Sequence, residues 1–133
     1  MLLVETYIDC TEKMGVGLFA KKFIKKGTMY WTRNESFDRL FTESEMDLLE
    51  EFAVFYIKKY GFMEMSGHWY LCNDNARFSN HSDNPNSEIN FNEKGIAQYY
   101  VTTKDIQPGE QLLIDYRKVC QTCVGGVDFK PLN

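Results

Sequence analysis

The stretch RFSNHSDNPN, at residues 77–86, decides how this sequence is interpreted. It is dense in hydrogen-bonding side chains and has few apolar positions, so it suits neither a helix nor a strand. Such a run becomes ordered only when its side chains bond to the backbone or to a ligand. It therefore predicts a structured loop at a functional site or, in the simplest alternative, an Asx-rich surface turn around Pro85.

Two chemical interpretations of this loop are weak. His81 and Asp83 are candidate metal ligands, but the only other histidine is His68 and no third ligand follows at a suitable spacing. A hydrolytic Ser–His–Asp arrangement lacks the glycines of a nucleophile elbow around Ser79 or Ser82. We therefore expect no metal ion and no hydrolytic triad.

Two further segments could contribute to a functional site. In MGVGLFA, residues 14–20, Gly15 and Gly17 allow backbone amides to approach a bound ligand closely. In GEQLLIDY, residues 109–116, a predicted strand ends on Tyr116, which places a phenol at the edge of a sheet. Taken singly, the first is more often an ordinary turn and the second more often a packing tyrosine.

The composition fits one globular domain. The chain has 133 residues, of which 44% are hydrophobic and 15% aromatic, enough to fill one core. It contains no run of about 18 apolar residues, and its first ten residues lack the pattern of a signal peptide. Four cysteines in that context predict reduced thiols. We expect a cytoplasmic protein, or a nuclear one in a eukaryote, that is neither secreted nor bound to a membrane.

The charge argues against nucleic acid as the main partner. The formal net charge is −4 and the pI is near 5.2, whereas nucleic-acid-binding domains usually carry a basic surface. The feature that favours such a domain is a short lysine run, Lys21, Lys22, Lys25 and Lys26. Lysines on a strand and turn are more typical of a solvated edge that discourages aggregation.

Short strands dominate the predicted secondary structure. We expect them at residues 2–8, 17–24, 28–32, 68–72, 88–91, 96–103 and 111–115. Turns are predicted at Gly27, at 92–95 and at 107–110. Many short strands with one helix predict a mainly β domain without a βαβ layout.

The predicted helix covers residues 42–61. Thr42 and Glu45 form a capping-box pattern at its start, and Gly61 stands where a C-terminal cap belongs. Apolar residues recur every three or four positions, and we expect this stripe to pack in the core: Met46, Leu49, Ala53, Tyr56 and Tyr60.

Taken in this order, residues 14–20, 77–86 and 109–116 resemble the SET domain of the protein lysine methyltransferases. Residues 96–108 and 70–73 are also similar to that family. The resemblance implies a β-clip fold of several small sheets around a pseudoknot made by the last two motifs. It implies a single domain over 1–133, with N-terminal strands at 1–35, an inserted helix at 42–61, core motifs and pseudoknot at 68–117, and a C-terminal tail at 118–133.

The same resemblance implies an S-adenosylmethionine-dependent protein-lysine N-methyltransferase. The cofactor would lie against Met14, Gly15, Val16 and Gly17, with Tyr70, Arg77, Asn80 and His81 lining the rest. A lysine of a protein substrate, such as a basic, histone-like protein, would enter a channel beside Ile114 and meet the methyl group at the catalytic Tyr116. The sequence contains no G-x-G-x-x-G run opening a helix, which argues against a Rossmann-type methyltransferase.

The chain departs from the family pattern at several positions. Asp83 stands where the family has cysteine, and Cys120-x-x-Cys123 does not have the family's zinc-binding spacing, so we expect no zinc. In the tail, Phe129 is a candidate lid or a packing residue. Residues 30–35 lack the usual Tyr-x-Gly-Glu, which leaves open what walls the lysine channel. Ile114, where relatives often have Phe or Tyr, favours more than one methylation.

The main alternative is a non-catalytic SET-fold module that binds a peptide or partner. The presence of Asn80, His81 and Tyr116 together argues for the enzyme, because a pure binding module would not need all three.

Overall fold

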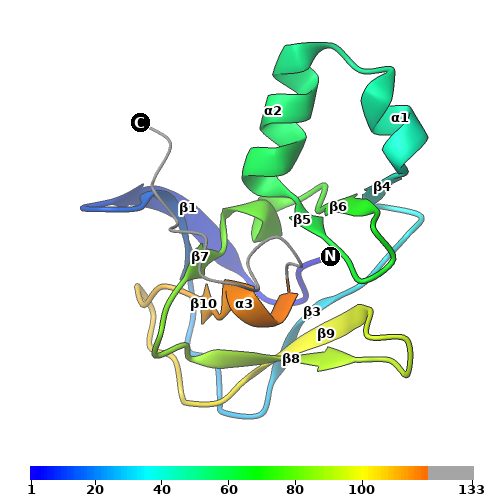
Figure 1. Ribbon diagram of the computed structural model, residues 1–133. Coiled ribbons are helices and arrows are strands. Elements are labelled where there is room, and N and C mark those ends of the chain that lie inside the picture. Colours follow the sequence, from blue (N-terminus) through cyan, green and yellow to red (C-terminus); the bar gives the residue numbers. More distant parts are fainter. Residues whose placement is uncertain (120–133) are drawn as a thin grey trace.

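The computed structural model describes residues 1–119 of the chain (Figure 1). Over this range the chain forms the following short strands: β1 (Thr6–Thr11), β2 (Gly15–Ala20), β3 (Met29–Thr32), β4 (Arg39–Phe41), β5 (Phe62–Met63), β6 (Trp69–Leu71), β7 (Asn80–His81), β8 (Ser87–Phe91), β9 (Ala97–Thr102) and β10 (Leu113–Ile114). The helical elements are α1 (Glu43–Asp47), α2 (Glu51–Tyr60), a 3-10 turn η1 (Asn75–Phe78) and α3 (Tyr116–Val119).

The strands form several small sheets. Strands β3, β9 and β8 make an antiparallel sheet in that order, and β4, β6 and β5 make a second one. Strands β1 and β2 form a hairpin, while β7 and β10 form a parallel pair. This confirms the predicted fold class, a mainly β domain of small sheets with one main helical segment.

Glycines shape the predicted turns. Gly27 adopts a φ of 85°, in the left-handed region where a Cβ is unfavourable, as its position in the predicted turn required. The hairpin between β8 and β9 closes with the Gly95 N–H donating to the Asn92 carbonyl at 2.9 Å, and Gly95 has a φ of 73°.

The predicted helix over 42–61 is divided in two. Thr42 and Glu45 do form the capping box of α1, but Glu50 is extended (ψ 147°) and becomes the N-cap of α2. The break lets Met46 of α1 and Ile57 of α2 pack together on Trp69, which a continuous helix would not do.

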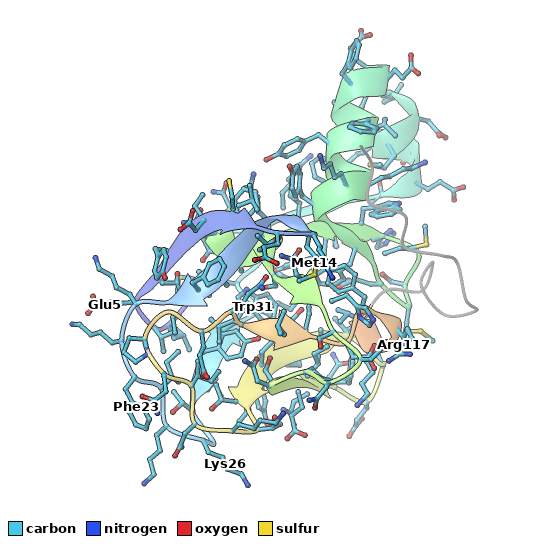
Figure 2. All side chains as sticks on the ribbon, turned by 90° about the vertical axis from the view of Figure 1, so that its left-hand side faces the viewer. Glu5, Met14, Phe23, Lys26, Trp31 and Arg117 are labelled. Carbon is cyan, nitrogen blue, oxygen red and sulfur yellow. The ribbon has the colours of Figure 1, made fainter. Side chains whose placement is uncertain are left out.

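The predicted apolar stripe is therefore wrong as a core face. Of its members only Met46 is buried; Leu49 and Tyr56 are exposed, and the buried residue of α2 is Ile57. Helices α1 and α2 stand away from the β body in Figures 1 and 2. Within residues 1–119, every helix is too short or too polar to cross a bilayer.

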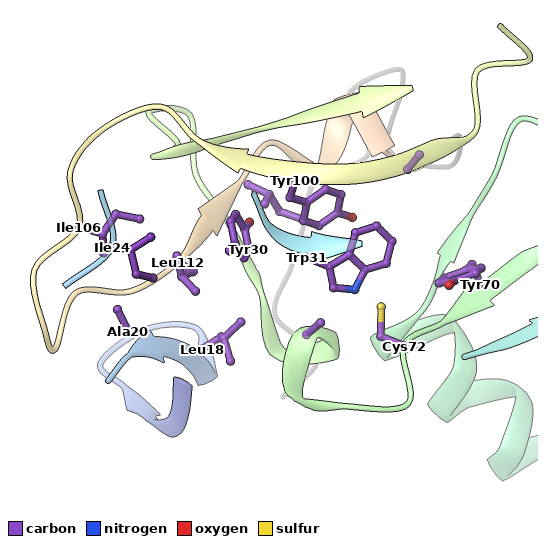
Figure 3. Close-up of a cluster of buried hydrophobic side chains, with 13 residues drawn as sticks. Leu18, Ala20, Ile24, Tyr30, Trp31, Tyr70, Cys72, Tyr100, Ile106 and Leu112 are labelled. Carbon is purple, nitrogen blue, oxygen red and sulfur yellow. The ribbon is translucent and has the colours of Figure 1, made fainter. Parts of the chain in front are cut away.

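The main core lies between the sheets and the segment that contains η1. Trp31 is fully buried, with its ring 4.5 Å from that of Tyr100 and 6.2 Å from that of Tyr70. Figure 3 shows the indole nitrogen directed toward the sulfur of Cys72. Burial raises the pKa of the Cys72 thiol to about 12, so this cysteine is a neutral packing residue at physiological pH.

Candidate active site

The three sequence motifs meet around β10. On one side, Leu113 and Ile114 pair in parallel with β7, opposite Asn80 and His81. On the other side, the backbone N–H of Leu112 donates to the carbonyl of Leu18 at 2.8 Å, and Gln111 forms a bridge with β2. Residues 111–114 therefore join the glycine motif to the loop at 77–86.

Asn80 ties these motifs together. Its side-chain Nδ2 donates to the carbonyl of Val16 at 3.1 Å and to Oε1 of Gln111 at 2.7 Å. Gly17 lies beside this contact, where a Cβ would come within 2.5 Å of Gln111 Oε1 and 2.8 Å of Thr11 Cγ2. A side chain at position 17 would therefore have to displace Gln111 and Thr11 from this contact.

A cavity of about 300 Å³ opens at this junction, and we call it the glycine-strand cavity. It is lined by Met14, Gly15, Val16, Lys59, Tyr60, Arg77, Phe78, Asn80 and Tyr116. A Cβ on Gly15 would meet no atom within 4 Å, so the backbone here faces open space. The glycine motif thus forms an accessible wall beside two cationic side chains, Lys59 and Arg77.

A second cavity of about 140 Å³, the aromatic cavity, lies next to the first. Its lining residues are Lys58, Lys59, Tyr60, Gly61, Phe62, Cys72, Ala76, Arg77, Ser79, Tyr100, Ile114, Tyr116 and Val119. Four residues line both cavities: Lys59, Tyr60, Arg77 and Tyr116. Tyr116 therefore stands where the two cavities adjoin.

Tyr116 is fixed by hydrogen bonds from both its backbone N–H and its hydroxyl. Its hydroxyl donates a short hydrogen bond to the backbone carbonyl of Ser79. Its backbone N–H donates to Nδ1 of His81 at 3.1 Å, and the two rings lie 5.6 Å apart. The position of the phenol is thus determined by the loop at 77–86.

Arg117 connects the same loop to α3. It donates to Asp115 at 2.8 Å and forms an ion pair with Asp83 at 3.0 Å. The hydrogen bond from Arg117 lowers the pKa of Asp115, which keeps that carboxylate ionised next to His81. Asp83, where the family usually has cysteine, therefore has an electrostatic partner instead.

Arg77 is fixed in the wall shared by the cavities. Its Nε donates to the Cys72 carbonyl at 3.0 Å, and its Nη1 donates to the Tyr56 hydroxyl at 2.6 Å. Tyr60 packs edge-on against Phe78 with ring centroids 5.4 Å apart. Helix α2 thereby contributes a basic and aromatic wall to both cavities.

The structure brings together most of the residues that the sequence assigned to the cofactor. Met14, Gly15, Val16, Arg77 and Asn80 line the glycine-strand cavity with Tyr116, and Ile114 lines the aromatic cavity. Gly17 and His81 lie behind this wall, where they contact Gln111 and Tyr116 respectively.

Tyr70 does not belong to this set. It is fully buried, its hydroxyl donates to Asp38 Oδ2 at 2.5 Å, and Arg33 stacks over its ring at 4.2 Å. It lines neither cavity. We correct its assignment from cofactor site to core, because its place in β6 directs the ring inward beneath Arg33.

Sequence reasoning missed several wall residues. Lys59 and Tyr60 come from the last turn of α2, Phe62 from β5 and Tyr100 from β9. No motif marks them, because a wall residue needs only to be large and correctly placed. Phe78 and Ser79 were also missed although they lie inside the motif at 77–86, and Ser79 offers its backbone carbonyl to Tyr116.

The tail predictions fall outside the part of the chain that the structure describes. This applies to Cys120, Cys123 and Phe129. Between residues 1 and 119, no three His, Cys, Asp or Glu side chains gather as a metal-binding group. The expected absence of zinc stays a prediction.

Comparison with known proteins agrees with this geometry. A solved chain of a humanized mutant of the Chaetomium thermophilum Polycomb Repressive Complex 2, bound to the inhibitor GSK126, matches with a TM-score of 0.63 and 18% identity. The match covers 89% of this chain and 15% of that one, and at this identity it shows the fold alone. No curated protein sequence matches significantly. The sequence model of the SET domain matches residues 15–117, a range that contains all of the last two motifs and all but Met14 of the first, and the chain therefore belongs to the SET-domain family.

Proposed function

We propose that this protein transfers a methyl group from S-adenosylmethionine to the ε-amine of a lysine in a protein substrate. The observation that carries the proposal is the position of Tyr116 between two adjoining cavities. Members of the SET-domain family are generally lysine methyltransferases. Methyl transfer to an amine requires a donor and an acceptor that meet from different sides at one point, with water excluded.

The glycine-strand cavity fits the cofactor. S-adenosylmethionine, when bound, supplies an electrophilic methyl group on a positively charged sulfonium. Lys59 and Arg77 offer cationic partners for its carboxylate, and Tyr60 and Phe78 offer apolar surface. The open backbone at Gly15 lets a ligand approach the main chain without meeting a side chain.

The aromatic cavity suits the lysine. A free lysine has a pKa near 10.4, so at neutral pH deprotonation costs about 5 kcal/mol. Tyr100 and Ile114, both buried, supply apolar surface that disfavours the charged form. Lys58 and Arg77 line the same cavity, and their positive charges oppose a second cation there. Both effects favour the neutral, nucleophilic amine.

Tyr116 orients the amine. Its hydroxyl proton is donated to the Ser79 carbonyl, so its oxygen acts toward the amine as a hydrogen-bond acceptor. An acceptor at this point holds an amine N–H and directs the nitrogen lone pair toward the methyl donor. His81 maintains this position by accepting the backbone N–H of Tyr116. We infer that Tyr116 positions the amine and stabilises the transition state, and that it does not act as a strong base.

The first test measures binding and substrate transfer. Isothermal titration with S-adenosylmethionine should show one site, and incubation of the protein with radiolabelled cofactor and a cell lysate should label lysine residues. The net charge of −4 favours a basic target such as a histone-like protein. Absence of cofactor binding would instead favour a non-catalytic SET-fold module.

The second test concerns Tyr116. Tyr116→Phe should lower turnover at least about 100-fold, because it removes the acceptor for the amine. Cofactor affinity should change little, since the ring stays in place. Tyr7→Phe, at an exposed tyrosine of β1, is the matched control and should retain full turnover. Full activity of Tyr116→Phe would remove this residue from the proposed role.

A further inference from the structure

The face of α2 that points away from the core carries large exposed apolar side chains. Val54 and Ile57, on the inner side of α2, pack in the core cluster around Trp69. Phe52 and Phe55 lie on the opposite side and are 87% and 50% exposed. Leu48, in the connection between α1 and α2, is also 87% exposed. Large apolar side chains that are exposed together on one element mark an interaction surface.

This surface projects from the rest of the molecule. Figures 1 and 2 show α1 and α2 projecting from the β sheets. We call the surface formed by Leu48, Glu51, Phe52, Phe55 and Lys59 the outer α2 face. All five residues are exposed to solvent. Lys59, in the last turn of α2, also borders both cavities, and its Nζ lies 5.2 Å from the centre of the Tyr60 ring.

The charges on the outer α2 face lie toward opposite ends of the helix. Glu51 lies in the first turn of α2, and Lys58 and Lys59 lie in the last. Glu51, Phe55 and Lys59 follow each other at intervals of four residues, so they lie along one side of the helix. An acidic residue and a basic residue therefore flank a central phenylalanine at equal distances along the chain.

We propose that the outer α2 face is the interface of a symmetric dimer with a second copy of this chain. Two α2 helices that run antiparallel about a two-fold axis at Phe55 bring Glu51 of each copy opposite Lys59 of the other. A two-fold interface uses the same surface on both subunits and must be its own complement. The sequence of α2 meets this condition for charge at Glu51 and Lys59 and for apolar contact at Phe55.

The proposed dimer is weak. A stable interface typically covers about 800 Å² on each partner, and a surface of three apolar and two charged residues offers less. Affinity follows the few buried aromatic anchors, here Phe52 and Phe55. We expect a dissociation constant on the order of 1 to 100 µM, so assembly depends on concentration in an ordinary experiment.

Sedimentation velocity of the full chain, without cofactor, tests the proposal. The sedimenting mass should rise from 15.6 kDa toward twice that value as the concentration increases from about 1 µM to several hundred micromolar. Phe52→Glu should stay monomeric, and because the side chain is 87% exposed, its circular dichroism and unfolding temperature should match the unchanged protein. A monomer at every concentration would overturn the proposal, and the face would then belong to another partner.

Charge exchange gives a sharper readout. Glu51→Lys and Lys59→Glu should each weaken the dimer about tenfold, since each places like charges opposite one another. The double variant should restore the original affinity, because the pair is exchanged in both copies. Glu93→Lys, an exposed glutamate in the β8–β9 hairpin, is the control and should have no effect. Failure of the double variant to recover affinity would rule out this antiparallel arrangement. Since assembly is measured without cofactor, this outcome is independent of the proposed methyltransferase activity.

Discussion

At the scale of single residues, the site depends on the absence of a side chain at Gly17. Gly17 has no Cβ, and the space this leaves is filled by Gln111, whose Oε1 accepts a hydrogen bond from Asn80. A glycine, a glutamine and an asparagine from three separate motifs are thus packed into a single contact. Residues that share a contact in this way are energetically coupled, and the coupling is measurable by double-mutant cycles.

Gly17→Ala should destabilise the protein by about 1 to 3 kcal/mol, because the added methyl group displaces the Gln111 amide and breaks its bond to Asn80. Gln111→Ala should relieve part of this, so the double variant should be less destabilised than the sum of the two single variants. Gly15→Ala is the control: it has positive-φ strain but no neighbour, and its effect should add to that of Gln111→Ala. Thermal unfolding of these variants measures the difference. Strict additivity at Gly17 would contradict the proposed contact.

At the scale of elements, the helical segment shows how local and tertiary signals combine. The capping box fixes where α1 begins, because Thr42 accepts from the Glu45 N–H and the Glu45 carboxylate accepts from the Thr42 N–H. The end of α1 has no comparable local signal. The chain breaks before α2 because burial of Met46 and Ile57 on Trp69 requires a change of direction.

Thr42→Ala should lower the free energy of unfolding by about 1 kcal/mol, since it leaves the Glu45 N–H without its side-chain acceptor. Thr42→Ser keeps the oxygen and should remain within about 0.5 kcal/mol of the unchanged protein. Urea denaturation followed by circular dichroism gives both values. Equal losses in the two variants would indicate that the threonine methyl group, and not the cap, stabilises this helix.

At the scale of the whole molecule, a buried ion pair joins the two larger sheets. Arg33, just after β3, and Glu64, just after β5, form a double hydrogen bond between guanidinium and carboxylate. Their side chains are only 9% and 3% exposed. Removing Glu64 leaves the buried guanidinium of Arg33 with only the exposed Glu35 as a charged partner, and this loss costs far more than the buried pair itself contributes.

Glu64→Gln should therefore destabilise the protein by about 3 kcal/mol. The matched control is Glu35→Gln, because Glu35 pairs with the same arginine at 2.9 Å but is 67% exposed. Its loss should cost less than about 1 kcal/mol. Chemical denaturation of the two variants at the same ionic strength compares them directly. Similar effects at both positions would show that burial of the Arg33–Glu64 pair is energetically unimportant.

The sequence by itself determined the features that depend on neighbouring residues. The capping box at Thr42, the positive φ at Gly27 and the Asn92–Gly95 hairpin follow from local stereochemistry, which residues within one turn decide. The three motifs likewise indicated the SET family. They named most of the residues that line the glycine-strand cavity.

Only the tertiary structure decided which side chains face that cavity. Strands β5 and β7 have two residues each, too few for any periodicity, and they exist because a distant partner supplies their hydrogen bonds. The same reason explains why Tyr70 lies in the core and why Tyr60 lines the site. Whether a side chain faces the cavity or the core depends on how its strand or helix packs against elements that are distant in the sequence. Neighbouring residues do not carry this information.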